Sequence, residues 1–180
     1  IAISNTVVKE YELLNIESSK IVRIPNGVDI DRLSVSIDKK KIRKIFNIDS
    51  DDFVMLTVGR YHPKKNFESI IEIAKKLKDK ADFKFKFIIF GSGNECLNDV
   101  INKELLSDVV KIIPNNSEAL NFDELPDNHL ISLYRLSDIF LFPSFIETFG
   151  IVLIEAMAAG LPVITSNGPG CIDIVDGGTY

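Results

Sequence analysis

The chain has 180 residues, of which 46% are hydrophobic, and a formal charge of −5. The length suits one domain with its own core, and the hydrophobic content excludes an intrinsically disordered chain. The acidic balance argues against general nucleic-acid binding, and no apolar run reaches the length of a membrane span. Cys96 and Cys171 fit no metal-ligand spacing and predict reduced thiols of a cytosolic protein. The sequence starts without Met and ends in a turn-like DGGTY, so we expect a piece of a larger protein.

The first fifty residues predict short, separate elements. A helix is expected over about 6–14, with Ser4 or Asn5 as its cap. A short strand followed by a Pro–Asn–Gly turn is expected within KIVRIPNGVD, residues 20–29. A second helix over 38–48 would place Ile42, Ile45 and Phe46 on one face. Its basic run could contact anionic lipid or phosphate, but a solvated helix face is the favoured interpretation.

From residue 53 onward, predicted strands and helices alternate along the chain. The strands are apolar runs at 53–59, 85–91, 109–114, 138–143 and 162–166. The helices between them are expected at 66–79, 94–107, 126–136 and 150–159. This alternation predicts an α/β fold, in which a Rossmann-like parallel sheet carries helices on both faces.

Glycines gather in the loops that follow these strands. In an open parallel sheet such loops share one rim, where ligands bind. Gly150 also opens a predicted helix, whose free N–H groups favour an anion at residues 150–152. Each glycine alone is better explained by a tight turn, but the set, with Arg60, Lys64 and Lys65 beside it, favours a ligand site. The six glycines of this rim are Gly59, Gly91, Gly93, Gly150, Gly168 and Gly170.

The loop GSGNEC, residues 91–96, matches part of a dinucleotide-binding fingerprint. Cys96 stands where the third glycine belongs, and the loop follows an interior strand rather than the first strand of the fold. A nicotinamide-dependent oxidoreductase is therefore an alternative that the pattern does not favour.

Two acids, Glu147 and Glu155, interrupt the apolar stretch of residues 142–164. A buried carboxylate without a partner is costly, so both acids need one. Glu155 would lie about 6 Å along the helix axis from the helix start. From there it could accept hydrogen bonds from a ribose, while Glu147 faces the opposite side of bound phosphates, where a sugar would lie. The alternative leaves Glu147 solvated and pairs Glu155 with a basic residue.

Five segments match one family in order and spacing. Glu147 and Glu155 form Glu-x7-Glu in a stretch that resembles the signature of family 4 retaining glycosyltransferases, which have the two-domain GT-B fold. The resemblance implies the C-terminal donor-binding half of that fold: residues 1–20 form the domain junction, residues 21–180 form the nucleotide-sugar-binding domain, and the N-terminal acceptor domain is absent. The other matching segments are IPNGVD (24–29), VGRYHPKKNFE (58–68), FIIFGSGNE (87–95) and LYRLSDIFLFPS (133–144).

The resemblance also implies roles for the matching residues. Arg60 and Lys65 would hold the donor diphosphate and stabilise the leaving group, Glu147 would contact the transferred sugar, and Glu155 would bind the ribose. The family often has glycine where this chain has Asn66, and usually another soon after the strand at 109–114, so the nucleobase contacts could differ here. The other donor-binding residues implied are Gly59, Gly91, Gly93, Ile113 beside the base, Phe149, Gly150, Ile151 and Val152.

The expected activity is transfer of a hexose from a nucleotide-diphosphate sugar to an acceptor hydroxyl, with retention of configuration. The acceptor would be a glycan or a lipid-linked glycan. We expect a cytoplasmic enzyme, with peripheral contact of the full-length protein at the inner face of the membrane, and an isolated domain without activity. No metal and no cofactor are expected. The alternatives are a nucleotide-sugar epimerase of the same fold and a non-catalytic nucleotide-sugar-binding module.

Overall fold

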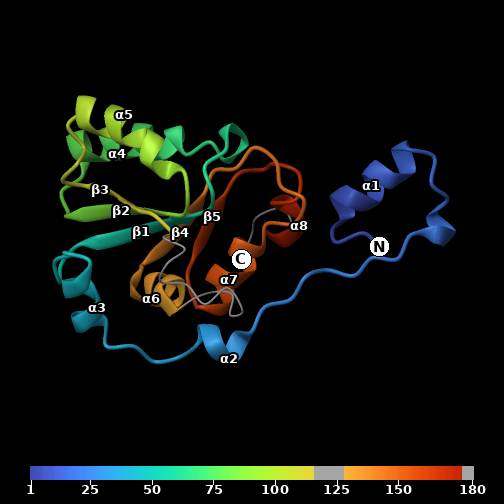
Figure 1. Cartoon of the computed structure of the whole chain (residues 1–180), viewed down its shortest axis with the longest axis horizontal. Coiled ribbons are helices and arrows are strands. Elements are labelled where there is room, and N and C mark those ends of the chain that lie inside the picture. The colour runs from blue at the N-terminus through green and yellow to red at the C-terminus, as the bar shows by residue number, and fades with distance from the viewer. Residues whose placement is uncertain (116–127, 176–180) are drawn as a thin grey trace.

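The computed structural model describes residues 1–115 and 128–175. Within them, five parallel strands form one sheet in the order β3-β2-β1-β4-β5 (Figure 1). The five strands predicted from residue 53 onward are all present, and their parallel pairing confirms the α/β prediction. They are β1 (Phe53–Val58), β2 (Phe85–Phe90), β3 (Val110–Ile113), β4 (Ile139–Phe142) and β5 (Val163–Thr165).

The strands are mainly apolar, with Lys86 in β2 and Lys111 in β3 as charged exceptions, because most of the sheet is buried on both faces. Successive side chains of a strand point to opposite faces, so one strand contributes to two cores. In β1, Leu56 and Val58 belong to one core and Met55 to the other. In β2, Ile88 and Ile89 divide in the same way. An alternating pattern with polar residues would have left one face in water.

Helices cover both faces of the sheet, as predicted (Figure 1). One face is covered by α4 (Glu68–Lys80) and α5 (Asn98–Lys103), whose buried residues pack in the same core as Met55. The opposite face is covered by α6 (Asn128–Leu136) and α7 (Ile151–Ala158), together with the shorter α2 (Ile30–Leu33) and α3 (Lys39–Ile45). No helix among the described residues is long and apolar enough to cross a membrane.

Several short elements differ from the expectations. The strand predicted within residues 20–29 does not form, because Arg23 makes only an isolated bridge with Ala2. The helix predicted over 94–107 is a 3-10 turn, η3 (Asn94–Leu97), followed by α5, and Leu105 at φ +54° ends the helical stretch.

Three short helices also differ from the prediction. Ile45 does not share one face with Ile42 and Phe46 as predicted: α3 ends at Ile45, which is 61% exposed, whereas Ile42 and Phe46 pack against the core. The helices α2 and α8 (Ile172–Val175) have four residues each, too few to show a helical period in the sequence.

The helix α1 (Asn5–Leu13) stands apart from the sheet, near α8 (Figure 1). Ser4 is its cap, as predicted, and the Ser4 hydroxyl oxygen accepts a hydrogen bond from the backbone N–H of Val7 at 3.2 Å. An extended segment then leads from η1 (Ser18–Lys20) to α2 (Figure 1). The start of α1 makes hydrogen bonds with loops that lie at the carboxyl ends of the strands.

Candidate functional site

The strand order places the candidate site between β1 and β4. The chain first builds β1, β2 and β3 toward one edge of the sheet, then adds β4 and β5 on the other side of β1. In open parallel sheets, ligands bind at the carboxyl ends of the strands where the order reverses in this way. The loop after β1 carries Arg60 and Lys65, and the loop after β4 carries Glu147. The topology therefore brings the three residues predicted as catalytic to the same part of the rim.

Lys65 and Glu147 form an ion pair at this point. Lys65 Nζ lies 2.6 Å from Glu147 Oε1, and the two side chains are 19% and 11% exposed. The same ammonium group lies 5.0 Å from the centroid of the Phe142 ring, which is a cation–π geometry. Because both charges are largely shielded from water, their attraction is stronger than that of a surface pair. Glu147 is thus neither solvated nor unpaired, contrary to the alternative considered from the sequence.

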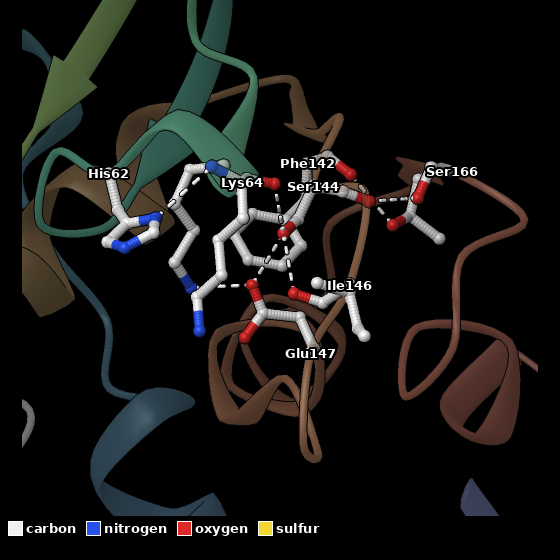
Figure 2. Close-up of polar contacts among 9 residues, drawn as sticks. His62, Lys64, Phe142, Ser144, Ile146, Glu147 and Ser166 are labelled. Carbon is white, nitrogen blue, oxygen red and sulfur yellow. Dashed lines mark hydrogen bonds and ion pairs between the residues drawn. The ribbon is translucent and has the colours of Figure 1, made fainter.

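Ser144 anchors the loop beneath Glu147, although sequence reasoning did not identify it as a site residue. Its side chain is fully buried, and its hydroxyl lies 2.7 Å from Glu147 Oε1 (Figure 2). The backbone carbonyl of this serine accepts a hydrogen bond from Ser166 Oγ (Figure 2). The backbone N–H of Phe145 donates to Lys64 O at 2.8 Å. A serine inside the otherwise apolar FPSF was the available sequence signal for this anchor.

Asn66 replaces a glycine that the family often has, and the structure explains why the exchange is tolerated. The residue follows η2 (Pro63–Lys65) in the left-handed conformation, at φ +54°, which asparagine adopts more readily than most residues. Its Nδ2 donates a hydrogen bond of 3.4 Å to Pro143 O in the loop after β4. Asn66 therefore ends the turn that carries Lys65 and bonds it to the loop after β4.

The loops after β1 and β2 touch through their backbones. A Cβ on Gly91 would overlap the carbonyl oxygen of Gly59, so this contact requires glycine. The fully buried Asn94 bridges the two loops, because its Nδ2 donates to Gly59 O at 2.9 Å and to Gly91 O at 3.0 Å. Asn94 was not predicted as a site residue. Gly93 adopts φ +78° at the start of η3, where a side chain would be strained.

The start of α7 faces the rim, with Gly150 as its cap at φ +85°. Among the described residues, no side chain accepts a hydrogen bond from the first turn of this helix. The N–H of Leu153 donates to Gly150 O at 2.9 Å, so the N–H groups of Ile151 and Val152 and the positive end of the dipole remain available to an anion. Phe149 is buried before the helix start, whereas Ile151 is 44% exposed and Val152 is partly buried.

Glu155 lies one turn into α7 and is 7% exposed. Its Oε2 accepts a hydrogen bond of 2.8 Å from the hydroxyl of Tyr134, a fully buried residue of α6. Its partner is therefore a neutral hydroxyl and not the basic residue of the alternative interpretation. Burial raises the pKa of Glu155 above its ordinary value of 4.5, and the hydrogen bond from Tyr134 acts in the opposite direction. The hydrogen bond from Tyr134 therefore holds the carboxylate in place, but ionisation of Glu155 in this buried position lowers the stability of the fold.

Two further predicted residues lie at the edges of this arrangement. Arg60 is exposed, and no residue in the described part of the chain forms an ion pair or side-chain hydrogen bond with it. Ile113 ends β3, and its carbonyl accepts a hydrogen bond of 3.0 Å from the N–H of Gly91.

Residues 116–127, where further base contacts were expected to differ from the family, lie outside the described residues. Residues 1–115 and 128–175 contain no group of three or more His, Cys, Asp or Glu side chains that could hold a metal ion.

A family model for glycosyl transferases group 1 matches residues 38–179 of this chain. The uncharacterized glycosyltransferase MJ1607 of Methanocaldococcus jannaschii is 27% identical over 179 residues, which cover 97% of this chain and 44% of the relative. A UDP-Gal:alpha-D-GlcNAc-diphosphoundecaprenol alpha-1,3-galactosyltransferase of Escherichia coli is 31% identical over 157 residues, which cover 86% of this chain and 38% of the relative. The chain thus spans less than half the length of these curated relatives.

A solved structure shows the same architecture at lower sequence similarity. Anabaena Alr3699/HepE in complex with UDP and glucose matches with a TM-score of 0.81 at 22% identity, over 97% of this chain and 46% of that one. This likeness confirms the predicted fold, a Rossmann-like half of the GT-B architecture. Because the family model covers most of the sequence, the chain belongs to the group 1 glycosyl transferases.

Proposed function

We propose that this chain is the donor-binding half of a retaining hexosyltransferase of family 4, which uses a nucleotide-diphosphate sugar. The observation that carries the proposal is the Lys65–Glu147 pair, which lies where the strand order reverses and joins the loop after β1 to the loop that leads to the start of α7. A cation, a helix start and an acid on one part of the rim match the diphosphate and sugar of such a donor. The Anabaena relative, solved with UDP and glucose, supports a nucleotide-sugar donor.

In this proposal, positive charge stabilises the departing nucleoside diphosphate. Lys65 and Arg60 lie on the loop after β1 and approach the phosphates from one side. The N–H groups at the start of α7 approach from the other side. Preorganised positive groups of this kind stabilise charge that grows in the transition state. The departing phosphate then takes the proton of the acceptor hydroxyl, which attacks from the same face of the sugar, so that configuration is retained.

The two acids would divide the recognition of the donor between them. Glu147 is held by Lys65 and Ser144 and would meet the hydroxyl groups of the transferred sugar. Glu155 would meet the ribose with the carboxylate oxygen that Tyr134 does not occupy. We propose that the acceptor, a glycan or a lipid-linked glycan, is bound mainly by a second domain, and that the enzyme acts in the cytoplasm, at the inner face of the membrane for a lipid-linked acceptor.

The first prediction concerns the two cations. In the full-length protein, Arg60→Ala and Lys65→Ala should each lower the rate of sugar transfer about 10²- to 10³-fold, because each removes charge that stabilises the leaving group. The matched control is Lys76→Ala, which should leave the rate unchanged, since Lys76 is exposed on α4 and not on a loop of the rim. Steady-state kinetics with near-normal rates for both test variants would refute the assignment.

The second prediction is that Glu155→Gln stabilises the fold and weakens donor binding. Since the folded pKa of Glu155 is raised, its contribution to stability is fully present below about pH 4.5 and is lost as the pH rises through the folded pKa. A neutral glutamine avoids this loss, so the melting temperature at pH 7 should rise by a few degrees, and the gain should shrink toward pH 4.5. Affinity for the free nucleoside diphosphate should fall roughly tenfold, or 1.4 kcal/mol.

The matched control for this stability gain is Glu104→Gln. Glu104 pairs with Lys75, and the hydrogen bond from that ammonium group lowers the pKa of Glu104. Its replacement should therefore give no gain at pH 7. Calorimetric melting and titration measure both effects, and unchanged nucleotide affinity in the Glu155 variant would remove its ribose role.

The third prediction separates Glu147 from Glu155. Glu147→Gln should leave the affinity for the nucleoside diphosphate unchanged or increase it, because Lys65 loses the internal charge that competes with phosphate. Sugar transfer by the full-length protein should nevertheless fall at least about tenfold, since an interaction with the reacting sugar is lost. Loss of nucleotide affinity in this variant would show that the site binds the donor in the opposite orientation.

The fourth prediction concerns the 180-residue chain itself. A thermal-shift screen with millimolar UDP-, GDP- and ADP-sugars should identify one nucleotide class with a dissociation constant in the high-micromolar to millimolar range, about −4 to −6 kcal/mol. EDTA should not change the affinity, because side-chain cations and a helix start hold the phosphates. Sugar transfer by this chain alone would contradict the proposal that a second domain is needed. Binding without turnover by the full-length protein would instead identify a non-catalytic binding module.

A further inference from the structure

The start of α1 is hydrogen bonded to the two loops that enclose Glu147. Ser4 is 1% exposed, and its Oγ donates to Thr148 O at 2.7 Å. The backbone N–H of Thr6 donates to Asp173 Oδ2 at 2.7 Å, and Thr6 Oγ1 accepts from the N–H of Gly170 at 3.1 Å. These contacts join residues that are more than 140 positions apart in the sequence. They are the points at which the segment before the sheet meets the rim described above.

The two loops are in turn packed directly on each other. The N–H of Glu147 donates to Pro169 O at 2.9 Å. A Cβ on Gly170 would overlap the carbonyl oxygen of Glu147, and a Cβ on Gly168 would overlap that of Phe145. With such close backbone contact, a displacement of the loop at 166–171 would be passed to Glu147. The loop at 166–171 therefore connects the start of α1 to the acid of the candidate site.

Asp173 has a favourable position for holding this connection. Its carboxylate lies at the N-terminus of α1, a helix of nine residues whose dipole attracts negative charge. A hydrogen bond between a charged acceptor and a backbone N–H is stronger than one between neutral groups. The function described above assigns no role to Asp173, Ser4 or Thr6, none of which would touch the donor.

We propose that Ser4, Thr6 and Asp173 are positioning residues. They tie the start of α1 to the loop that carries Glu147 and to the loop at 166–171, and so fix the placement of Glu147. The link to the donor rests on the proposed function, whereas the tie itself rests on the hydrogen bonds alone. Because α1 precedes the sheet in the chain, the tie makes the geometry of the donor site depend on how residues 1–6 are placed. Any movement of that segment would shift Glu147 relative to Lys65.

Amide hydrogen exchange, measured by NMR in the 180-residue chain, tests the tie without any ligand. The reporters are the N–H groups of Gly170 and Glu147, and the N–H of Leu56 in β1 serves as a reference for global opening. Asp173→Ala should speed exchange at both reporters about tenfold or more while leaving the reference unchanged. The isosteric Thr6→Val, which removes the acceptor of the Gly170 N–H, should have the same effect from the opposite side.

The matched control is Asp38→Ala. Asp38 is the cap of α3, and its carboxylate also accepts a hydrogen bond from a backbone N–H at a helix start, that of Lys41 at 3.1 Å. This bond joins neighbours in the sequence and does not connect α1 to the site. This variant should leave both reporters unchanged. Asp173→Asn, which keeps an acceptor oxygen for the Thr6 N–H, should restore part of the protection. Unchanged exchange at Glu147 in both Asp173→Ala and Thr6→Val would overturn the proposal.

Titration with UDP-, GDP- and ADP-sugars tests the consequence for the donor site. Because Glu147 would contact the transferred sugar, Asp173→Ala should weaken binding of whichever nucleotide-sugar the wild-type chain binds severalfold, and Asp38→Ala should not. Faster exchange at Glu147 with unchanged nucleotide-sugar affinity would overturn the positioning role. If the wild-type chain binds none of the three classes of nucleotide-sugar, the proposed function fails, and the exchange measurement alone decides whether the start of α1 is tied to Glu147.

Discussion

The ion pair between Lys65 and Glu147 is the contact on which the arrangement of the site depends. The two residues come from loops after β1 and β4, which are neighbours only because the strand order reverses between them. The acid holds the ammonium group close to the Phe142 ring, and Ser144 holds the acid. The cation therefore has a fixed position before any anion arrives. A flexible lysine on the surface would lose side-chain entropy on binding, and this preorganisation reduces that cost.

The same site contains a carboxylate that the fold has no structural need to bury. Glu155 lies against Tyr134 in an otherwise apolar helix, and burial raises its pKa. An apolar residue of similar size would pack there at lower cost. The combination of a destabilising charge with a place beside an uncapped helix start is typical of residues that serve a ligand.

The chain spans less than half the length of these curated relatives. The cations, the helix start and the two acids all lie on one wall of the proposed crevice. Such a wall can hold a donor and stabilise a leaving group, but an acceptor hydroxyl also has to be placed, and water has to be excluded. The hydrogen bonds between the start of α1 and the donor-site loops show one route by which the placement of the preceding segment would reach Glu147.

The sequence by itself determined the alternation of strands and helices, because fully buried strands need continuous apolar runs and surface helices need a period of 3.6 residues. It also indicated the rim glycines and the spacing of Glu147 and Glu155, since both are local properties of the chain. The sequence did not indicate α2 and α8, because four-residue helices are too short to show a helical period. It also predicted a strand within residues 20–29 that does not form. Only the tertiary structure decided that Glu147 pairs with Lys65, that Glu155 is bound by Tyr134, and that Ser144, Asn94 and Asp173 support the site. The bonds from Lys65 to Glu147, from Tyr134 to Glu155, from Asn94 to Gly59 and from Thr6 to Asp173 all join residues distant in sequence. Strand order, which local patterns do not encode, sets which loops meet.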